Sequence, residues 1–273
     1  MKAIRYIAAG LTTLTLVAGL TASNVAKAES TLEKIKRTGK FLAGVRFDYP
    51  PVGSVDRDGK NIGFGVDIAK AFGEKLGVAP TFVQTTSRNR IPLLQSGGID
   101  AEIGPTTPTK ERDEAVDFSI PYYWDEAVIL TRKGESTDPK AFGPPKKMAT
   151  TQGSYFGEYF HRLFPQAEYT TFQEYSEAVI ALQQSKVDGV LINRYVAAEY
   201  AKRFPSLQYT ASYVRDPIAI GVREDDSKWR DFVNFTLQEL WAAGKYQAMF
   251  KAHFGYEPDF QLWSPYGLQP GIK

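Results

Sequence analysis

Three arginines lie close to the ends of three predicted strands in the first half of the chain. Arg46 follows "FLAGV", Arg90 lies in "SRNRIPLL", and Arg112 ends the segment "GPTTPTKER". The planar guanidinium group of arginine can bind a carboxylate through two parallel hydrogen bonds. Ligands of open α/β sheets bind beyond the carboxyl ends of the strands, so these side chains could meet at one edge. A ligand with one carboxylate cannot satisfy three inward-pointing arginines, whereas a dicarboxylate can. The alternative for each arginine alone is a place on the solvated surface.

Arg112 occupies an unusual place for a cation. We expect a short helix to start with Thr109, which puts Arg112 in the first turn. A positive charge there opposes the helix macrodipole, which favours acidic residues at that end. Either Arg112 pairs with Glu111 or Asp113 in solvent, or it faces an anion together with Thr107 and free backbone N–H groups.

Other polar groups follow predicted strands and could join the same site. Tyr49 precedes two prolines, and Ser87 and Pro105 lie beside Arg90 and Thr107 in the sequence. In the second half, "TTQGSY" places the N–H groups of Ser154 and Tyr155 at a helix N-terminus, and Asn193 ends the strand "VDGVLI". The aromatic run Tyr122–Trp124 either stacks on a ligand or belongs to the core or the cleft wall.

No catalytic or cofactor motif accompanies these residues. The two histidines, His161 and His253, lie in predicted helices, and the sequence contains no cysteine. There is no H-E-x-x-H zinc motif and no P-loop, and "GFGVD" has Ile68 where a dinucleotide fingerprint needs its third glycine. We therefore expect a binding protein without a metal or cofactor rather than an enzyme.

The elements that would position these residues alternate between strands and helices. "FLAGVRF" and "APTFVQ" read as strands around the amphipathic helix 65–77, and a second alternation runs from "KMATTQG" to "NRYVAAEYAKRF". The pattern predicts an α/β fold with two lobes, each a mostly parallel sheet flanked by helices. We expect residues 29–132 and 222–273 to form lobe 1 and residues 133–221 to form lobe 2. Two strands, 126–134 and 216–222, would form the hinge, and a small molecule would bind in the cleft. The alternative is two independent domains on one linker.

The first 28 residues have the pattern of a secretory signal peptide. Lys2 and Arg5 precede the apolar run "IAAGLTTLTLVAGL", and Ala26-Lys27-Ala28 supplies an A-x-A cleavage site. The alternative is an uncleaved membrane anchor. Without a cysteine there is no site for a lipid anchor and no disulfide. We expect cleavage after Ala28 and a soluble monomer in a bacterial periplasm.

The charge balance gives no sign of a nucleic-acid partner. The chain has 33 basic and 31 acidic residues, a net charge of +2. Removal of Lys2, Arg5 and Lys27 with the signal peptide would leave 30 basic and 31 acidic residues, a net charge of −1. No long basic run remains in the mature chain.

Several longer segments resemble a known family. They are "DYPPVGSVDRDGKNIGFGVDIAKAFGEKLG", "SRNRIPLLQSGGIDAEIGPTTPTKERDEAVDFSIPYY" and "GKYQAMFKAHFG". They are similar to the extracellular solute-binding proteins of family 3, which serve amino-acid ABC importers, and most of all to glutamate- and aspartate-binding members. The resemblance covers nearly all of residues 32–255. It implies the two-lobed periplasmic-binding-protein fold of type II, ligand capture by cleft closure, and an ABC permease in the inner membrane as partner.

The resemblance also implies roles for individual residues. Arg112 would hold the ligand's α-carboxylate, helped by Thr107 and the N–H groups around Ser154. The Pro105 carbonyl would accept a hydrogen bond from the α-ammonium group. Arg46, Arg90 and Ser87 would bind the ligand's side-chain carboxylate. Tyr49 would line the cleft.

Two positions depart from the family pattern. Gly65 replaces an aspartate of the usual "GFDVD", which we expect to affect packing more than binding. Asn193 replaces the acid that binds the ligand's ammonium in the family, and a neutral amide binds a cation less strongly than a carboxylate does. A dicarboxylate or an amino-acid derivative without a free amine is therefore an alternative ligand.

An enzyme is the third alternative. Cyclohexadienyl dehydratases share this fold, and the resemblance implies that they place a catalytic glutamate just after the glycine turn of the second lobe. The matching position here is Phe156, and Glu158 lies two residues further on.

Overall fold

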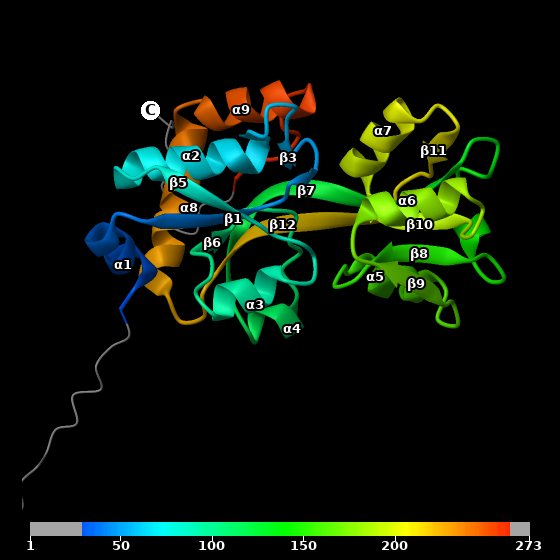
Figure 1. Cartoon of the computed structure of the whole chain (residues 1–273), viewed down its shortest axis with the longest axis horizontal. Coiled ribbons are helices and arrows are strands. Elements are labelled where there is room, and N and C mark those ends of the chain that lie inside the picture. Colours follow the sequence, from blue (N-terminus) through cyan, green and yellow to red (C-terminus); the bar gives the residue numbers. More distant parts are fainter. Residues whose placement is uncertain (1–28, 263–273) are drawn as a thin grey trace, which may run out of the picture.

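The structure is a computed structural model that describes residues 29–262, and it consists of two lobes connected by two long strands (Figure 1). The predicted signal peptide, residues 1–28, lies outside the described residues. Both lobes combine strands with covering helices, as the alternation in the sequence predicted, so the fold is the two-lobed α/β architecture.

Lobe 1 is built from both ends of the chain. Its N-terminal elements are α1 (Thr31–Thr38), β1 (Phe41–Val45), β2 (Asp48–Tyr49), β3 (Gly53–Val55), β4 (Asn61–Ile62), α2 (Phe64–Leu76), β5 (Pro80–Gln84), α3 (Arg90–Gln95), β6 (Ala101–Glu102) and α4 (Lys110–Asp113). The C-terminal helices α8 (Ser227–Ala242) and α9 (Lys245–Phe254) return to the same lobe and pack beside α2 (Figure 1).

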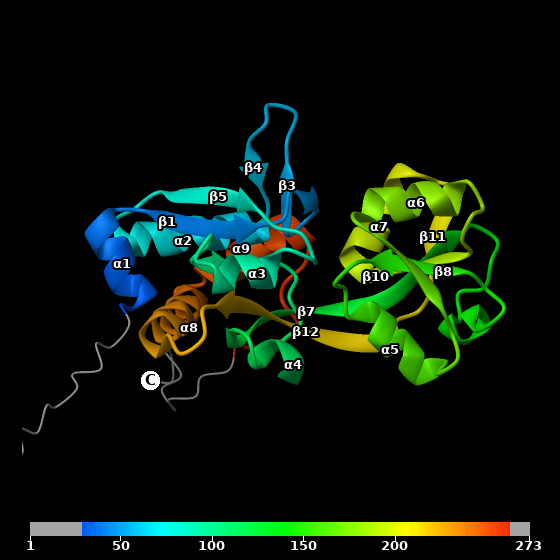
Figure 2. The ribbon, with the colours of Figure 1, turned by 60° about the horizontal axis from the view of Figure 1, so that its bottom comes forward.

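Lobe 2 lies between these two parts in the sequence. Its elements are the 3-10 helix Pro139–Phe142, β8 (Met148–Thr151), α5 (Phe156–Leu163), β9 (Tyr169–Phe172), α6 (Tyr175–Gln183), β10 (Gly189–Asn193), α7 (Arg194–Arg203) and β11 (Leu207–Tyr209). Helices α5, α6 and α7 surround the strands of this lobe in both views (Figures 1 and 2).

Two antiparallel strands join the lobes, β7 (Asp117–Arg132) and β12 (Val214–Val222). In lobe 1, β12 pairs with β6 at Gly221, and in lobe 2, β7 pairs with β10 from Ala127 onward. The described strands thus form one continuous sheet in the order β5-β1-β6-β12-β7-β10-β8-β9, with β11 paired to β7. Pairing is parallel among the strands on either side and antiparallel at the hinge, which contains the two strands that the sequence predicted. A smaller sheet, β2-β3-β4, projects from lobe 1 (Figure 2).

The core of lobe 1 centres on Phe64 at the start of α2. Its ring stacks on Tyr122 with the ring centroids 5.9 Å apart and meets Tyr123 edge to face at 6.2 Å. Both tyrosines are fully buried, so they belong to the core and do not stack on a ligand. Trp124, half-buried, packs against Phe260 instead. Aromatic pairs of this kind contribute beyond their buried area, which suits a helix that must hold the strand ends of lobe 1 in place.

Gly65 shows why the sequence departs from the family pattern at this position. A Cβ atom at Gly65 would lie 2.4 Å from the carbonyl oxygen of Ile103, which follows β6. Real Cβ atoms do not approach a backbone oxygen so closely, so only glycine permits this distance between α2 and β6. The replacement therefore affects packing, as expected.

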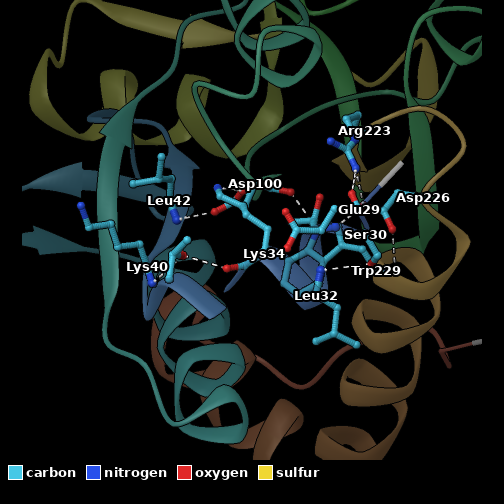
Figure 3. A network of polar contacts seen from close by, with 12 residues as sticks. Glu29, Ser30, Leu32, Lys34, Lys40, Leu42, Asp100, Arg223, Asp226 and Trp229 are labelled. Atoms are coloured by element: carbon cyan, nitrogen blue, oxygen red, sulfur yellow. Dashed lines mark hydrogen bonds and ion pairs between the residues drawn. The ribbon is translucent and has the colours of Figure 1, made fainter. Parts of the chain in front are cut away.

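The start of the described chain is tied to the end of the sheet by a polar network (Figure 3). Ser30 caps α1 in a capping box with Glu33, and the N–H of Thr31 donates to the carboxylate of Asp226 (2.6 Å). Asp226 also caps α8 by accepting from the N–H of Trp229 (3.3 Å), whose indole N–H donates to the carbonyl of Asp100 (2.7 Å). One buried carboxylate therefore holds the first turns of two helices together.

We predict that Asp226→Ala destabilises the protein by about 1–3 kcal/mol, because one change removes a helix cap and leaves a buried N–H group without its acceptor. Burial acts to raise the pKa of Asp226, but hydrogen bonds from Thr31, Ser30 and Trp229 lower it overall. The stabilisation is therefore present above the ordinary pKa of an aspartate and is lost as the pH falls through the depressed value.

Urea unfolding of wild type and variant at pH 7 and at pH 3 measures this effect. Ser227→Ala is the matched control, since Ser227 is the exposed next residue. Equal stability of wild type and Asp226→Ala at pH 7 would contradict the prediction.

Candidate ligand-binding site

A small cavity lies where the two lobes meet. Residues predicted as ligand contacts line it from both lobes: Tyr49, Ser87, Arg90, Pro105, Thr107, Ser154 and Asn193. Tyr155, Phe156 and Tyr175 complete the lining. Tyr175 was missed by the sequence reasoning, although it starts α6 close after the end of β9, where a cleft-facing residue is expected.

The two remaining predicted contacts, Arg46 and Arg112, do not line the cavity. Arg46 is 1% exposed and forms a bidentate ion pair with Asp48, with both N–O distances 2.8 Å. Its Nη2 atom also lies 3.3 Å from the carboxylate of Glu174, which precedes α6 in lobe 2. Arg46 therefore already binds two carboxylates of the protein, and one of these contacts crosses the cleft.

The carboxyl groups of Asp48 and Glu174 meet at this cross-cleft contact. Burial, the hydrogen bond with Asp48 and repulsion from its charge raise the pKa of Glu174 to about 8, against the attraction of Arg46. For Asp48, burial acts to raise the pKa, but Arg46 and the hydrogen bond from Glu174 hold it below its usual value. The pair thus shares one proton at neutral pH, and Arg46 pairs mainly with the charged Asp48.

Arg90 and Arg112 lack such partners. Arg90 is 3% exposed, donates from Nη1 to the carbonyl of Pro105 (2.9 Å), and has an unpartnered Nε atom. Burial lowers the pKa of Arg90, and Glu102 is the acid that acts most strongly to raise it. Neither arginine forms an ion pair within 4.0 Å with a carboxylate of the described chain. The surface ion pair of Arg112 with Glu111 or Asp113, one of the two sequence alternatives, is therefore not formed.

Arg112 instead spans the cleft from the short helix α4. Thr109 caps this helix by accepting from the N–H of Arg112 (3.3 Å). The guanidinium donates to the carbonyls of Thr107 (2.7 Å) and Gly153 (3.1 Å), and Gly153 belongs to lobe 2. Burial and then repulsion from Arg90 lower the pKa of Arg112. It is a partly desolvated cation whose hydrogen bonds go to neutral carbonyl groups.

Buried acids lie close to these arginines, and the charges of Arg112 and Arg90 act to lower the pKa of Asp216. Asp216 accepts hydrogen bonds from the hydroxyl groups of Thr107 (2.9 Å) and Tyr159 (3.1 Å). The proton of the Thr107 hydroxyl is thus used by Asp216 and is not free for a ligand carboxylate. Burial raises the pKa of Asp216 to about 6 and that of Asp125 to about 8. Asn193 acts to lower the pKa of Asp125, so the amide lies near that carboxyl group, although no hydrogen bond of ordinary geometry joins them.

The lobes touch closely beside the cavity. Gly153 has a φ of 79°, in the left-handed region, and a Cβ atom added to it would lie 2.6 Å from the carbonyl oxygen of Ser87 in lobe 1. The N–H of Ser154 donates to the carbonyl of Thr151 within the same turn. The glycine turn of lobe 2 therefore rests directly on the Ser87 loop, and the structure represents the closed arrangement of the lobes.

The family model for bacterial extracellular solute-binding proteins, family 3, matches residues 41–256. The chain belongs to this family. Its two-lobed architecture, with a cavity between lobes, is that of the type II periplasmic-binding-protein fold, as the resemblance of the sequence segments implied. Among the described residues, no helix is long and apolar enough to cross a membrane.

Curated relatives and solved structures with similar sequences are named for amino-acid binding. The chain is 29% identical to the glutamine-binding protein of Geobacillus stearothermophilus over 77% of this chain and 83% of the relative. It is 30% identical to the L-arginine-binding protein of Pseudomonas aeruginosa over 78% of this chain and 87% of the relative. A crystal structure of an ancestral amino-acid-binding protein, a precursor of cyclohexadienyl dehydratase, superposes with a TM-score of 0.76 at 30% identity, covering 83% of this chain and all of the other.

We predict that the solute affinity of wild type, relative to that of Glu174→Gln, falls about tenfold between pH 7 and pH 9. Closure raises the pKa of Glu174 to about 8, so the closed form holds a proton that the open form lacks. A raised carboxyl pKa favours closure at low pH, and this contribution is lost as the pH rises through the raised value. Calorimetric titration with glutamate or glutamine, whichever binds more tightly, measures the profile.

Glu174→Gln replaces the protonated carboxyl with a neutral amide of the same shape. Its profile should lack the contribution of Glu174 and retain the titrations of the ligand's amine and of the other groups at the site. The same profile in both proteins would assign the proton to another group.

Proposed function

We propose that the protein captures an acidic amino acid, glutamate or aspartate, by cleft closure for an ABC importer. The observation that carries this proposal is a pair of cationic side chains, Arg90 in the cavity wall and Arg112 beside the lining residue Thr107. Neither has a carboxylate within 4.0 Å among the described residues. Burial of an unpaired charge is costly unless a partner of opposite charge arrives. A ligand with two carboxylates would supply one partner to each guanidinium.

The two carboxylates would take different positions. Arg112 reaches across the cleft beside Thr107 and Gly153, so it would bind the α-carboxylate as the lobes close. Arg90 lines the cavity with a free Nε donor and would bind the side-chain carboxylate, with Ser87 beside it. Arg46 would act indirectly, because its ion pairs with Asp48 and Glu174 already occupy the guanidinium. Tyr49 would line the cleft.

Amino-acid capture is also supported by the relatives. Two relatives with similar sequences are named for glutamine and arginine. These ligands share the α-amino and α-carboxylate groups and differ in their side chains. The proposal of acidic specificity is supported by the arginines of this chain and not by the ligands for which the relatives are named.

We also propose that the mature protein begins at Glu29, acts as a monomer in the periplasm, and delivers its ligand to an inner-membrane permease. The family is extracellular, and the signal pattern of residues 1–28 accounts for export. The carbonyl of Glu29 accepts from Arg223 (2.7 Å), so the folded contacts extend back to the proposed first residue.

We predict that Arg90→Gln weakens glutamate binding by about 2–5 kcal/mol, the typical cost of removing one partner of a desolvated charge pair. Glutamine has no side-chain carboxylate, so its affinity should change far less. Calorimetry with both ligands measures the selectivity. Arg88→Gln is the matched control, since Arg88 is exposed and lies two residues away. A wild-type protein that prefers glutamine or arginine would contradict acidic specificity.

A dicarboxylate without an amine is the second candidate ligand. The Nδ2 donor of Asn193 is buried and unpartnered, and Asn193 lines the cavity. A donor at this place suits an anionic or neutral ligand group, whereas the family acid suits an ammonium. Comparison of glutamate with glutarate, its amine-free counterpart, separates the two candidates.

We further propose that the protein is not a dehydratase, although one structural relative is a precursor of cyclohexadienyl dehydratase. Phe156, 4% exposed, lines the cavity where the resemblance places the catalytic glutamate, and a phenyl ring cannot transfer a proton. We predict no turnover of prephenate or arogenate in a spectroscopic assay of the purified protein. Turnover that disappears in Phe156→Ala would reverse this conclusion.

A further inference from the structure

Two buried aspartates face each other across the hinge. Asp125 on β7 and Asp216 on β12 are direct partners in the strand register, and their exposed fractions are 1% and 0%. Like charges at directly opposed positions destabilise a sheet, and burial increases their repulsion. Neither carboxylate forms an ion pair within 4.0 Å with a cation of the described chain.

The hydrogen bonds of the two carboxylates leave them open to a further partner. Asp216 accepts from two neutral hydroxyl groups, those of Thr107 and Tyr159. One oxygen of Asp125 accepts from the N–H of Glu126 (2.7 Å), and the other has no hydrogen bond of ordinary geometry within the described part of the chain. A buried carboxylate oxygen without a donor is costly, so this pair has room for a cation or a proton.

The unpartnered oxygen lies behind the cavity wall. Among the described residues, the titratable groups that face Asp125 are Asp216 on β12, Tyr49 on β2, Tyr123 on β7 and Tyr195 on α7. The charge of Asp125 acts on the Tyr49 hydroxyl more strongly than that of any other group. The Tyr49 hydroxyl and the Asn193 Nδ2 atom are both buried and unpartnered, and both residues line the cavity.

We propose that Asp125 and Asp216 together supply the negative charge that holds the ligand's ammonium group, in place of the acid that position 193 lacks. The Asn193 amide can accept from the ammonium through its oxygen and donate to Asp125 through its nitrogen, so the carboxylate acts through one intervening side chain. This inference rests on the proposed capture of an amino acid, and it names the group that selects for the amine.

The arrangement also predicts which proton moves. Without a cation, burial raises the pKa of Asp125 to about 8, with repulsion from Asp216 adding to it, so this carboxyl is protonated at pH 7. An ammonium placed beside Asn193 favours the charged carboxylate, so binding releases a proton from Asp125. Lobe closure takes up a proton at Glu174 with any ligand. The difference between an amine-bearing and an amine-free ligand therefore isolates Asp125.

The test uses three pairs of probes, each an amino acid and its counterpart without the α-amine. They are glutamate and glutarate, glutamine and the monoamide of glutaric acid, and arginine and 5-guanidinopentanoate. Affinities are measured by calorimetry for wild type, Asp125→Asn and Glu126→Gln. Glu126 is the control because it is the next residue on the strand and pairs with Arg194 at the surface.

We expect Asp125→Asn to weaken the amine-bearing probe of the best-binding pair about tenfold, the difference between a charged and a neutral hydrogen-bond partner. The amine-free probe should bind as well as before or more tightly, and Glu126→Gln should change neither. Titration of wild type at pH 7 in two buffers of different ionisation enthalpy should show extra proton release with the amine-bearing probe. Asp125→Asn should abolish this difference.

The outcomes separate this inference from the acidic specificity. The identity of the probe pair that binds most tightly to wild type tests the acidic specificity. The change that Asp125→Asn causes in the affinity ratio of the amine-bearing to the amine-free probe of that pair tests the role of the hinge aspartates. An unchanged ratio in a folded Asp125→Asn protein, or no extra proton release in wild type, overturns the inference. Binding of amine-free probes alone, or of none, overturns it as well. If Asp125→Asn does not fold, Asp216→Asn and the wild-type proton count decide.

Discussion

Burial of charge that the protein itself does not neutralise is the constraint on which this structure depends. Among the described residues, Arg90 and Arg112 form no ion pair with a carboxylate within 4.0 Å, and Asp125 and Asp216 form none with a cation, although Thr107 hydrogen-bonds to both Arg112 and Asp216. Each arrangement is unfavourable in a low-dielectric environment. A zwitterionic ligand with an additional carboxylate would pair with the arginines and with the aspartates at the same time. The unfavourable free energy of the unpaired charges in the ligand-free protein would therefore favour a ligand with these three groups.

The hinge makes this complementarity a property of the closed form. Strands β7 and β12 continue through both lobes, so the aspartates remain paired when the lobes move. The contacts across the cleft, in contrast, depend on the closed arrangement of the lobes. Arg112 reaches Gly153, and Arg46 reaches Glu174, only when the lobes are together. The shared proton of Asp48 and Glu174 then adds a dependence on pH to closure, independent of which ligand is bound.

The sequence predicted the lobes and most of the cavity wall because both follow from local rules. Strand ends in an α/β fold face the cleft, and this rule located Tyr49, Arg90 and Thr107 without any knowledge of their contacts. The rule failed for Arg46 because protein carboxylates occupy its guanidinium: Asp48, two positions along the chain, and Glu174, which is 128 positions away in the other lobe.

The hinge aspartates were also beyond sequence reasoning. Nothing in "YWDEAV" or "VRDPIA" indicates that Asp125 and Asp216 are buried and opposed, because burial and register arise only when β7 pairs with β12. A single aspartate beside a strand reads as a solvated residue. Long-range pairing of this kind is what converts ordinary residues into a site, and it cannot be inferred from spacing along one chain.

A crystal structure of the protein with glutamate tests the central claim most directly. We predict one carboxylate of the ligand on Arg112, the other on Arg90, and the ammonium group on the Asn193 side of the cavity, next to Asp125. A ligand whose side-chain carboxylate pairs with neither Arg90 nor Arg112, or whose ammonium points away from Asn193, would contradict it.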